Sequence, residues 1–360
     1  MEYWSAFQLA QHGENPYDPA LLFAVQHQAG LGWHLPTMMW NPPWLFLVMF
    51  PILRLDFLTA LACWRVVTLL VGGASVFLVQ AALNDPNDDS TQNYLVPLLA
   101  LLTYYPLWHG IESGQIHALL LLAFSCMFYG LVRQKNWCVA VGILLCSVKP
   151  HIFYLPLLAI AQQDLRARNF WRTGTSASLI ALAALISQVL WPHSISNWIT
   201  ALGMDPAGRY IPVQSWVVPT VVGFTRNLFS DSHGMMSVYP MILIPGVTGA
   251  LVFCWLIRQP RLNWKVLLPP LMVLSYLTSP YGWVSDQLIL LPAVLALLVQ
   301  GSKKGGLALL LCAIAIFMQP ITFALRLYWI HYEHQFFVFP AIILILCCVD
   351  IGSRRRNTPA

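Results

Sequence analysis

The chain has 360 residues, of which 58% are hydrophobic and only 9% are charged, with 19 basic and 14 acidic side chains. A soluble domain carries about 25% charged residues, so this chain has too few charges to cover a water-soluble globule. The composition excludes a soluble enzyme, a disordered chain and a secreted disulfide scaffold. It predicts an all-α polytopic membrane protein.

The first segment, 1–56, is polar and contains no lysine or arginine before Arg54. No signal peptide or apolar run precedes residue 43. Residues 42–56 are apolar but too short to span a bilayer, so we expect a helix lying at the interface. Trp40 and Trp44 would then lie at the level of the lipid headgroups.

A series of apolar runs follows, and several are shorter than the roughly 17–25 residues of a spanning helix. They predict a bundle of about 11 transmembrane helices. Lys149-Pro150 either separates two short helices or kinks one. The runs are 57–83, 94–108, 115–132, 136–149, 150–163, 172–191, 239–257, 264–279, 284–300, 305–320 and 336–350.

The basic residues favour one orientation of this bundle. When the runs alternate across the bilayer, 13 of the 19 basic residues lie on one side, which the positive-inside rule assigns to the cytoplasm. The long polar segments 1–56, 192–238 and 321–335 then lie at the outer face, together with all ten histidines. The basic residues that set this orientation are Arg133, Lys135, Arg166, Arg168, Arg172, Arg258, Arg261, Lys265, Lys303, Lys304, Arg354, Arg355 and Arg356.

We therefore expect one integral membrane domain over 1–360, without a soluble module. Its parts are an outer segment with an interfacial helix (1–56), a first helix group (57–191), a large outer loop (192–238), a second helix group (239–350) and a basic cytoplasmic tail (351–360). The net charge of +5 is small and unevenly distributed, so it does not indicate nucleic-acid binding.

Polar motifs recur at the expected outer ends of the helices. No Walker loop, GxGxxG or HExxH is present, which disfavours an ATP-driven pump, and the eight cysteines lack the spacing of a zinc site. The motifs are Asn15-Pro16-Tyr17-Asp18, Asn41-Pro42-Pro43, Glu112-Ser113-Gly114-Gln115-Ile116-His117, Lys149-Pro150, Gln214-Ser215-Trp216 and Ser279-Pro280-Tyr281-Gly282-Trp283.

Taken in order, these motifs resemble glycosyltransferase family 87, the mannosyltransferase-like members of the GT-C superfamily, over nearly the whole chain. Tyr3-Trp4-Ser5-Ala6 and Pro16-Tyr17 match the later part of the family's first pattern. The family's Gly-Gln-x-Asn is present as residues 114–117 and its Lys-Pro as Lys149-Pro150. Its Asn-Gln-Ser is approximated by residues 213–215, and its Ser-Pro-x-x-Trp by residues 279–283.

The chain also departs from the family pattern. The acidic residue of the pattern falls upstream of Met1, as does the amino-terminal transmembrane helix that the resemblance implies. This agrees with the unusual start of the chain, and we hypothesise a truncated gene model or a misplaced start. His117 replaces the usual Asn, and Asp286-Gln287 stand where relatives often have His-His.

The resemblance implies transfer of a hexose, such as mannose, from a polyprenyl phosphate to a lipid or glycan acceptor at the outer face of the cell membrane. Such a reaction needs a carboxylate as general base and cations that hold the departing phosphate. Glu2 is the first candidate for the base and Asp18 the second, although Asp18 also lies in a good turn sequence.

Candidates for the phosphate and for the sugar or acceptor come from several outer segments. Lys149, beside His151, is the first choice for the donor phosphate, with snorkelling to the interface as its alternative role. Arg209 and Arg226 come next. The candidates for the sugar or the acceptor are Glu112, Gln115, His117, Gln214 and Asp286.

Two of these residues have structural alternatives. Glu112, or Ser113 beside it, could cap the helix that follows. Asp286 lies inside an apolar run, where a carboxylate is costly unless it is paired, and Arg65 is one possible partner.

Two other functions fit the same sequence: a transporter or flippase of polyprenyl-linked sugars, and a catalytically inactive relative. The absence of an internal repeat and the clustering of polar motifs at one face favour the enzyme over a transporter. The sequence leaves the sugar, the acceptor, the divalent-metal dependence and the oligomeric state open.

Overall fold

The computed structural model describes residues 1–30, 32, 34–84, 94–203, 218–230, 237–259, 262–304 and 337–357, and the side chains of all of these except 300–304 and 351–357. Regular secondary structure in this part of the chain is helical throughout, as the composition predicts. Three helices, α4 (Phe57–Leu83), α10 (Trp171–Leu190) and α13 (Pro240–Arg258), are long and apolar enough to cross a membrane. The protein is therefore an all-α polytopic membrane protein.

The remaining helices are shorter, and several of them are also apolar. In chain order they are α1 (Glu2–Gln11), α2 (Pro19–Gln28), α3 (Leu45–Leu53), α5 (Leu95–Thr103), α6 (Tyr105–Ser113), α7 (His117–Val132), α8 (Asn136–Cys146), η1 (Pro150–Ile152), α9 (Tyr154–Ala167), α11 (Ser194–Gly203), α12 (Val221–Leu228), α14 (Trp264–Leu277), η4 (Ser285–Leu290), α15 (Leu291–Lys304) and α17 (Val338–Asn357).

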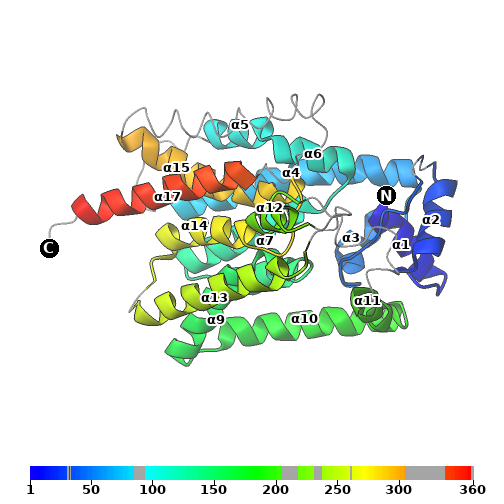
Figure 1. The fold of residues 1–360 in the computed structure, drawn as a ribbon. Helices are drawn as coiled ribbons and strands as arrows, with labels where there is room; N and C mark the ends of the chain where they lie inside the picture. Colours follow the sequence, from blue (N-terminus) through cyan, green and yellow to red (C-terminus); the bar gives the residue numbers. More distant parts are fainter. Residues whose placement is uncertain are drawn as a thin grey trace.

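The longer helices run roughly along one direction and form a bundle, while α1, α2, α3 and α11 gather at one end of it (Figure 1). The amino terminus lies at that end, and α17 carries the chain to the opposite end. The interfacial helix expected over 42–56 is present as α3. The segments 1–56 and 192–238, expected as long outer segments, also contain α1, α2, α11 and α12.

Proline and its neighbours decide where several apolar runs break. The run 94–108 is divided at Tyr104, whose backbone is extended. Pro106 lies in the first turn of α6, where the missing backbone N–H of proline costs no intrahelical hydrogen bond. Lys149-Pro150 separates α8 from α9, with a 3₁₀ turn between them. The run 284–300 begins as the 3₁₀ helix η4 before it continues as α15. The run 305–320 lies outside the described residues.

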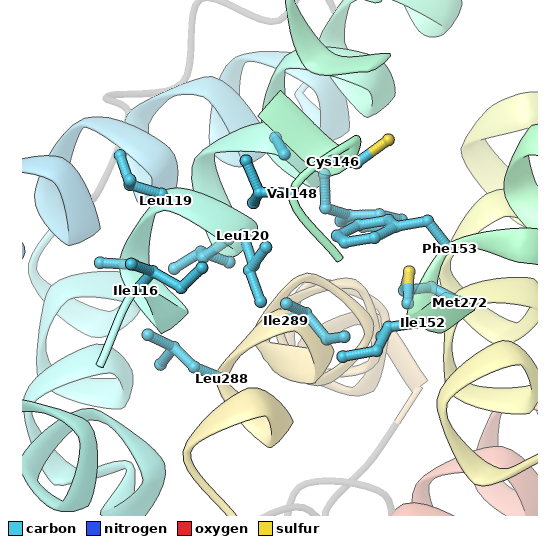
Figure 2. Packing of buried hydrophobic residues seen from close by; sticks show 14 of the residues in the cluster. Ile116, Leu119, Leu120, Cys146, Val148, Ile152, Phe153, Met272, Leu288 and Ile289 are labelled. Atoms are coloured by element: carbon cyan, nitrogen blue, oxygen red, sulfur yellow. The ribbon is translucent and has the colours of Figure 1, made fainter. Parts of the chain in front are cut away.

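The centre of the bundle is a continuous apolar cluster in which α7 packs against α4, α8 and η4. Figure 2 shows Ile116 and Leu120 of this region beside Leu288 and Ile289 of η4. Ile152 and Phe153, which follow the Lys149-Pro150 break, pack into the same cluster. The break in the chain is thus held on both sides by buried side chains.

Two glycines allow α7 and α8 to approach closely. A Cβ atom on Gly142 would lie 2.6 Å from Met127 Cγ and 2.7 Å from the carbonyl oxygen of Ala123. A Cβ on Gly130 would lie 2.7 Å from Val139 Cγ2. Small residues at a helix crossing are a usual means of close packing in membrane bundles.

Substituting Gly142→Ala is expected to destabilise the bundle by about 1–3 kcal/mol, because the added methyl group meets backbone as well as a side chain. The measurement is the thermal unfolding midpoint in detergent. Gly73→Ala is the matched control, since a Cβ at Gly73 in α4 has no atom within 4 Å. There the higher helix propensity of alanine should leave stability unchanged or slightly raised. Equal midpoints for both variants would contradict a tight α7–α8 contact.

Candidate active site

A cavity of about 670 Å³ opens among α1, the segment 34–41, α6 and the segment 281–285. Its volume lies within the range of small-molecule sites. The side chains around it are mainly apolar and aromatic, with a few polar groups among them. They are Glu2, Tyr3, His34, Leu35, Pro36, Thr37, Met38, Trp40, Asn41, His109, Ser113, Gln115, Lys149, Tyr281, Trp283, Val284 and Ser285.

Lys149 is the basic side chain on this cavity wall, and it is only 6% exposed. Its Nζ donates to both carboxylate oxygens of Asp286, at 2.9 and 3.0 Å. A buried ammonium is costly without a partner, so this ion pair accounts for a lysine at this depth. Lys149, rather than Arg65, is thus the partner of Asp286. Arg65 instead donates to the carbonyl oxygen of Ile111 at 3.4 Å.

Asp286 is 1% exposed and is held in turn by the backbone. Its Oδ2 accepts from the backbone N–H of Trp283 at 2.9 Å, which closes the turn before η4. The Ser-Pro-x-x-Trp motif therefore ends in a turn that fixes the carboxylate facing Lys149. Asp286 itself is absent from the cavity lining, so it lies behind the lysine as seen from the cavity.

The Asn41-Pro42-Pro43 motif fixes the other side of Lys149. Asn41 Nδ2 donates to the carbonyl oxygen of Val148 at 2.9 Å, and Trp44 Nε1 donates to Ser147 Oγ at 2.9 Å. Both bonds join the amino-terminal segment to the residues just before Lys149. The Asn41-Pro42-Pro43 and Lys149-Pro150 motifs are more than a hundred positions apart in the sequence, yet they form adjacent parts of the cavity wall.

The Gly114-Gln115 motif turns the chain from α6 into α7. Gly114 adopts a φ of +67°, which favours glycine, and the N–H of Gln115 bonds to the carbonyl oxygen of Gly110 at 2.9 Å. This turn directs Gln115 to the cavity. Its Oε1 accepts from the Tyr3 hydroxyl at 3.0 Å, and its Nε2 donates to Glu2 Oε1 at 3.3 Å.

Glu2, in the first turn of α1, is half-buried on the same cavity. Burial raises the pKa of its carboxyl group above the ordinary value of 4.5, while the Tyr3 hydroxyl, the chain amino group, Lys149 and Gln115 oppose the shift. A carboxylate with a raised pKa that faces a cavity is a usual feature of a general base.

The structure brings four of the predicted residues to one place, Glu2, Gln115, Lys149 and Asp286. His117 lies directly behind them: it is fully buried, and its Nδ1 is 3.1 Å from the carbonyl oxygen of Gln115. Its ring fills the space in which a Cβ on Gly110 would stand. His117 therefore supports the Gln115 turn and does not line the cavity.

Other predicted residues do not line the cavity. Asp18 caps α2 by accepting from the N–H groups of Ala20 and Leu21, and Arg226 is buried in α12 and donates to the carbonyl oxygen of Ser237 at 3.0 Å. His151 packs on the ring of Tyr281 with centroids 3.9 Å apart.

Three candidates for the phosphate and the sugar or acceptor remain, and of these Glu112 does not line the cavity. Glu112 is exposed near the carboxyl end of α6, and Ser113 bonds back to His109, so neither caps the start of α7. Arg209 and Gln214 lie outside the described residues.

Several cavity residues were not predicted as site residues, including His34, Trp40, His109 and Tyr281. Trp40, Tyr281 and Trp283 lie in or beside motifs that the sequence does show, so the signal was present but was assigned to the aromatic belt. His34 and His109 carried no pattern that separates them from the other histidines. In the part of the chain that the structure describes, no group of three or more His, Cys, Asp and Glu side chains is placed to hold a metal ion.

The fold and the site together describe an all-helical membrane bundle with a ligand-sized cavity that a buried lysine and a carboxylate line. The family model described as Glycosyltransferase family 87 matches residues 40–280. The chain therefore belongs to glycosyltransferase family 87, and it is a membrane glycosyltransferase. Searches of the curated proteins and of the solved structures found no match.

Proposed function

We propose that this enzyme transfers a hexose, with mannose as the first choice, from a polyprenyl-phosphate donor to a lipid or glycan acceptor. We place the reaction at the outer face of the cell membrane. The observation that carries the proposal is a cavity that holds a carboxylate, Glu2, and a buried lysine, Lys149, among aromatic walls. The distribution of basic residues along the chain supports the outer face.

In this mechanism Glu2 is the general base. The acceptor hydroxyl gives its proton to the Glu2 carboxylate while its oxygen attacks the anomeric carbon of the donor sugar. The bond between that carbon and the phosphate oxygen breaks, and its electron pair leaves with the polyprenyl phosphate. Each transfer therefore produces one glycosylated acceptor, one polyprenyl phosphate and one proton.

Lys149 is the group that receives the donor phosphate. Its side chain lines the cavity and its ammonium is paired with Asp286, and in this proposal the donor phosphate approaches that ammonium from the cavity without displacing the carboxylate. In a site shielded from water, a charge-assisted hydrogen bond to the leaving phosphate stabilises the negative charge that grows during the reaction. In this assignment Asp286 positions Lys149, in place of the sugar or acceptor contact predicted from the sequence.

Aromatic walls suit the sugar part of such a donor. The cavity is lined by the side chains of Trp40, Tyr281 and Trp283, and the same three side chains pack around Val218. Ring faces of this kind bind the apolar faces of sugars, while Gln115 offers polar contacts to hydroxyl groups. Arg209 and Gln214 stay predictions for the donor phosphate and the sugar.

The test uses membranes that contain the full chain together with a polyprenyl phosphate carrying a radiolabelled mannose. We expect the label to pass to a membrane lipid or glycan, with release of unlabelled polyprenyl phosphate. Membranes without the protein are the control. Movement of intact donor across the bilayer without cleavage would support a transporter instead, and neither cleavage nor movement would support an inactive relative.

A further inference from the structure

Tyr3 is a buried cavity residue whose hydroxyl lies beside both the Gln115 amide and the Glu2 carboxylate. It is 2% exposed and its Oη donates to Gln115 Oε1 at 3.0 Å. An amide oxygen only accepts hydrogen bonds and an amide nitrogen only donates them. Once Oε1 is turned to Tyr3, Nε2 is the atom left for Glu2, and it donates to Glu2 Oε1 at 3.3 Å.

Tyr3 and Gln115 are both held by their surroundings. The ring of Tyr3 borders the cavity on one side and a small apolar pocket, which includes Leu61 and Trp64, on the other. The backbone carbonyl of Gln115 accepts from Trp64 Nε1 at 3.2 Å and also faces His117 Nδ1 at 3.1 Å. These contacts fix the backbone from which the Gln115 side chain reaches Tyr3 and Glu2.

We propose that Tyr3 is a positioning residue that fixes the orientation of the Gln115 amide, so that its N–H rather than its carbonyl faces the Glu2 carboxylate. A carbonyl in that place would repel the carboxylate, and an N–H favours it. The inference rests on the proposed function, in which Glu2 is the general base. It adds to that function the hydrogen bonds of Tyr3 and Gln115, which orient the Glu2 carboxylate toward the acceptor hydroxyl.

The other groups around Glu2 are consistent with this role. The amino group of Met1 directly precedes the same helix, and Lys149 comes from the connection between α8 and η1. Asp286 of η4 is close enough to act on the Tyr3 hydroxyl, and His34 and His109 line the same cavity. The Tyr3 hydroxyl and the Gln115 amide both oppose the rise that burial causes in the pKa of Glu2.

The experiment compares Tyr3→Phe and Gln115→Met with the unchanged enzyme in steady-state kinetics. For both variants we expect kcat to fall on the order of tenfold, with the donor KM within about twofold, because the base is misplaced but the phosphate contact remains. The acid limb of the pH profile should move to higher pH, because the ionised carboxylate has lost a donor. Tyr154→Phe is the matched control. It removes another tyrosine hydroxyl, which bonds to Thr278 at 2.6 Å outside the cavity.

Thermal unfolding midpoints show whether each variant is folded. If Tyr3→Phe does not fold, Gln115→Met tests the same hydrogen bonds from the other partner. Unchanged kcat and an unchanged acid limb in both folded variants, with Glu2→Gln inactive, would overturn the positioning role and leave the proposed function in place. Full activity of Glu2→Gln would instead remove Glu2 as the base. A fall in kcat for Tyr154→Phe as large as for Tyr3→Phe would also overturn the role, because any lost hydroxyl would then suffice.

Discussion

Replacing Glu2 by glutamine is expected to lower kcat by at least about a hundredfold, because the amide keeps the size of the side chain but cannot take a proton. The donor KM should change by no more than about twofold, since Lys149 and the aromatic walls remain. The measurement is transfer of labelled sugar at saturating donor. Glu14→Gln is the matched control, because Glu14 is an exposed acid that follows the same helix.

The pH dependence of the same reaction tests the direction in which the pKa of Glu2 is shifted. Glu2 acts as a base only when ionised, and burial raises its pKa above 4.5. The rate should therefore fall as the pH drops through this raised pKa, at a higher pH than for an exposed carboxylate. The residual rate of Glu2→Gln should lack this acid limb. Asp18→Asn keeps a good helix cap and is therefore expected to fold. If this variant loses most of its activity while Glu2→Gln stays active, Asp18 is the base.

Replacing Lys149 by methionine is expected to have two separable effects. It leaves Asp286 buried without its cation, which costs about 3–5 kcal/mol of stability by analogy with other broken buried pairs. It also removes a charged hydrogen bond to the donor phosphate, and we expect the donor KM to rise by about tenfold or more. Thermal unfolding in detergent and donor titrations measure the two effects.

The double substitution Lys149→Met with Asp286→Asn separates stability from binding. It removes both charges, so most of the lost stability should return while the donor KM stays high. Arg65→Met is the control for loss of a positive charge outside the cavity, since Arg65 contacts a backbone carbonyl only through a long bond. A normal donor KM in the double variant would exclude Lys149 as the phosphate ligand.

The sequence was most informative where a single local property decides the structure. Scarce charge and long apolar runs predicted an all-α membrane protein, and proline predicted the break at Lys149-Pro150 without deciding between two helices and a kink. It was less informative about the polar segments. The helices α1, α2, α11 and α12 were not predicted, because helices of only 8 to 10 residues are marginal by themselves and depend on packing against the bundle.

The motifs likewise selected residues without showing how they meet. Gln115, Lys149 and Asp286 were all singled out, yet the candidate named as a partner of Asp286 was Arg65, because both lie in apolar runs. The tertiary structure pairs Asp286 with Lys149. His117 was selected as a ligand-binding residue, and only its burial against Gly110 shows that it supports the turn from behind.

Charge count and family motifs, both local properties of the sequence, determined that this protein is a helical membrane glycosyltransferase. The tertiary structure alone decided that Glu2, Gln115, Lys149 and Asp286 share one site, since they come from four segments spread over most of the chain. The physical reason is that a charge buried in an apolar bundle needs a partner, and the chain supplies that partner through the packing of distant helices. The scarce charges that first indicated a membrane protein are thus gathered, in part, at the cavity where we place the chemistry.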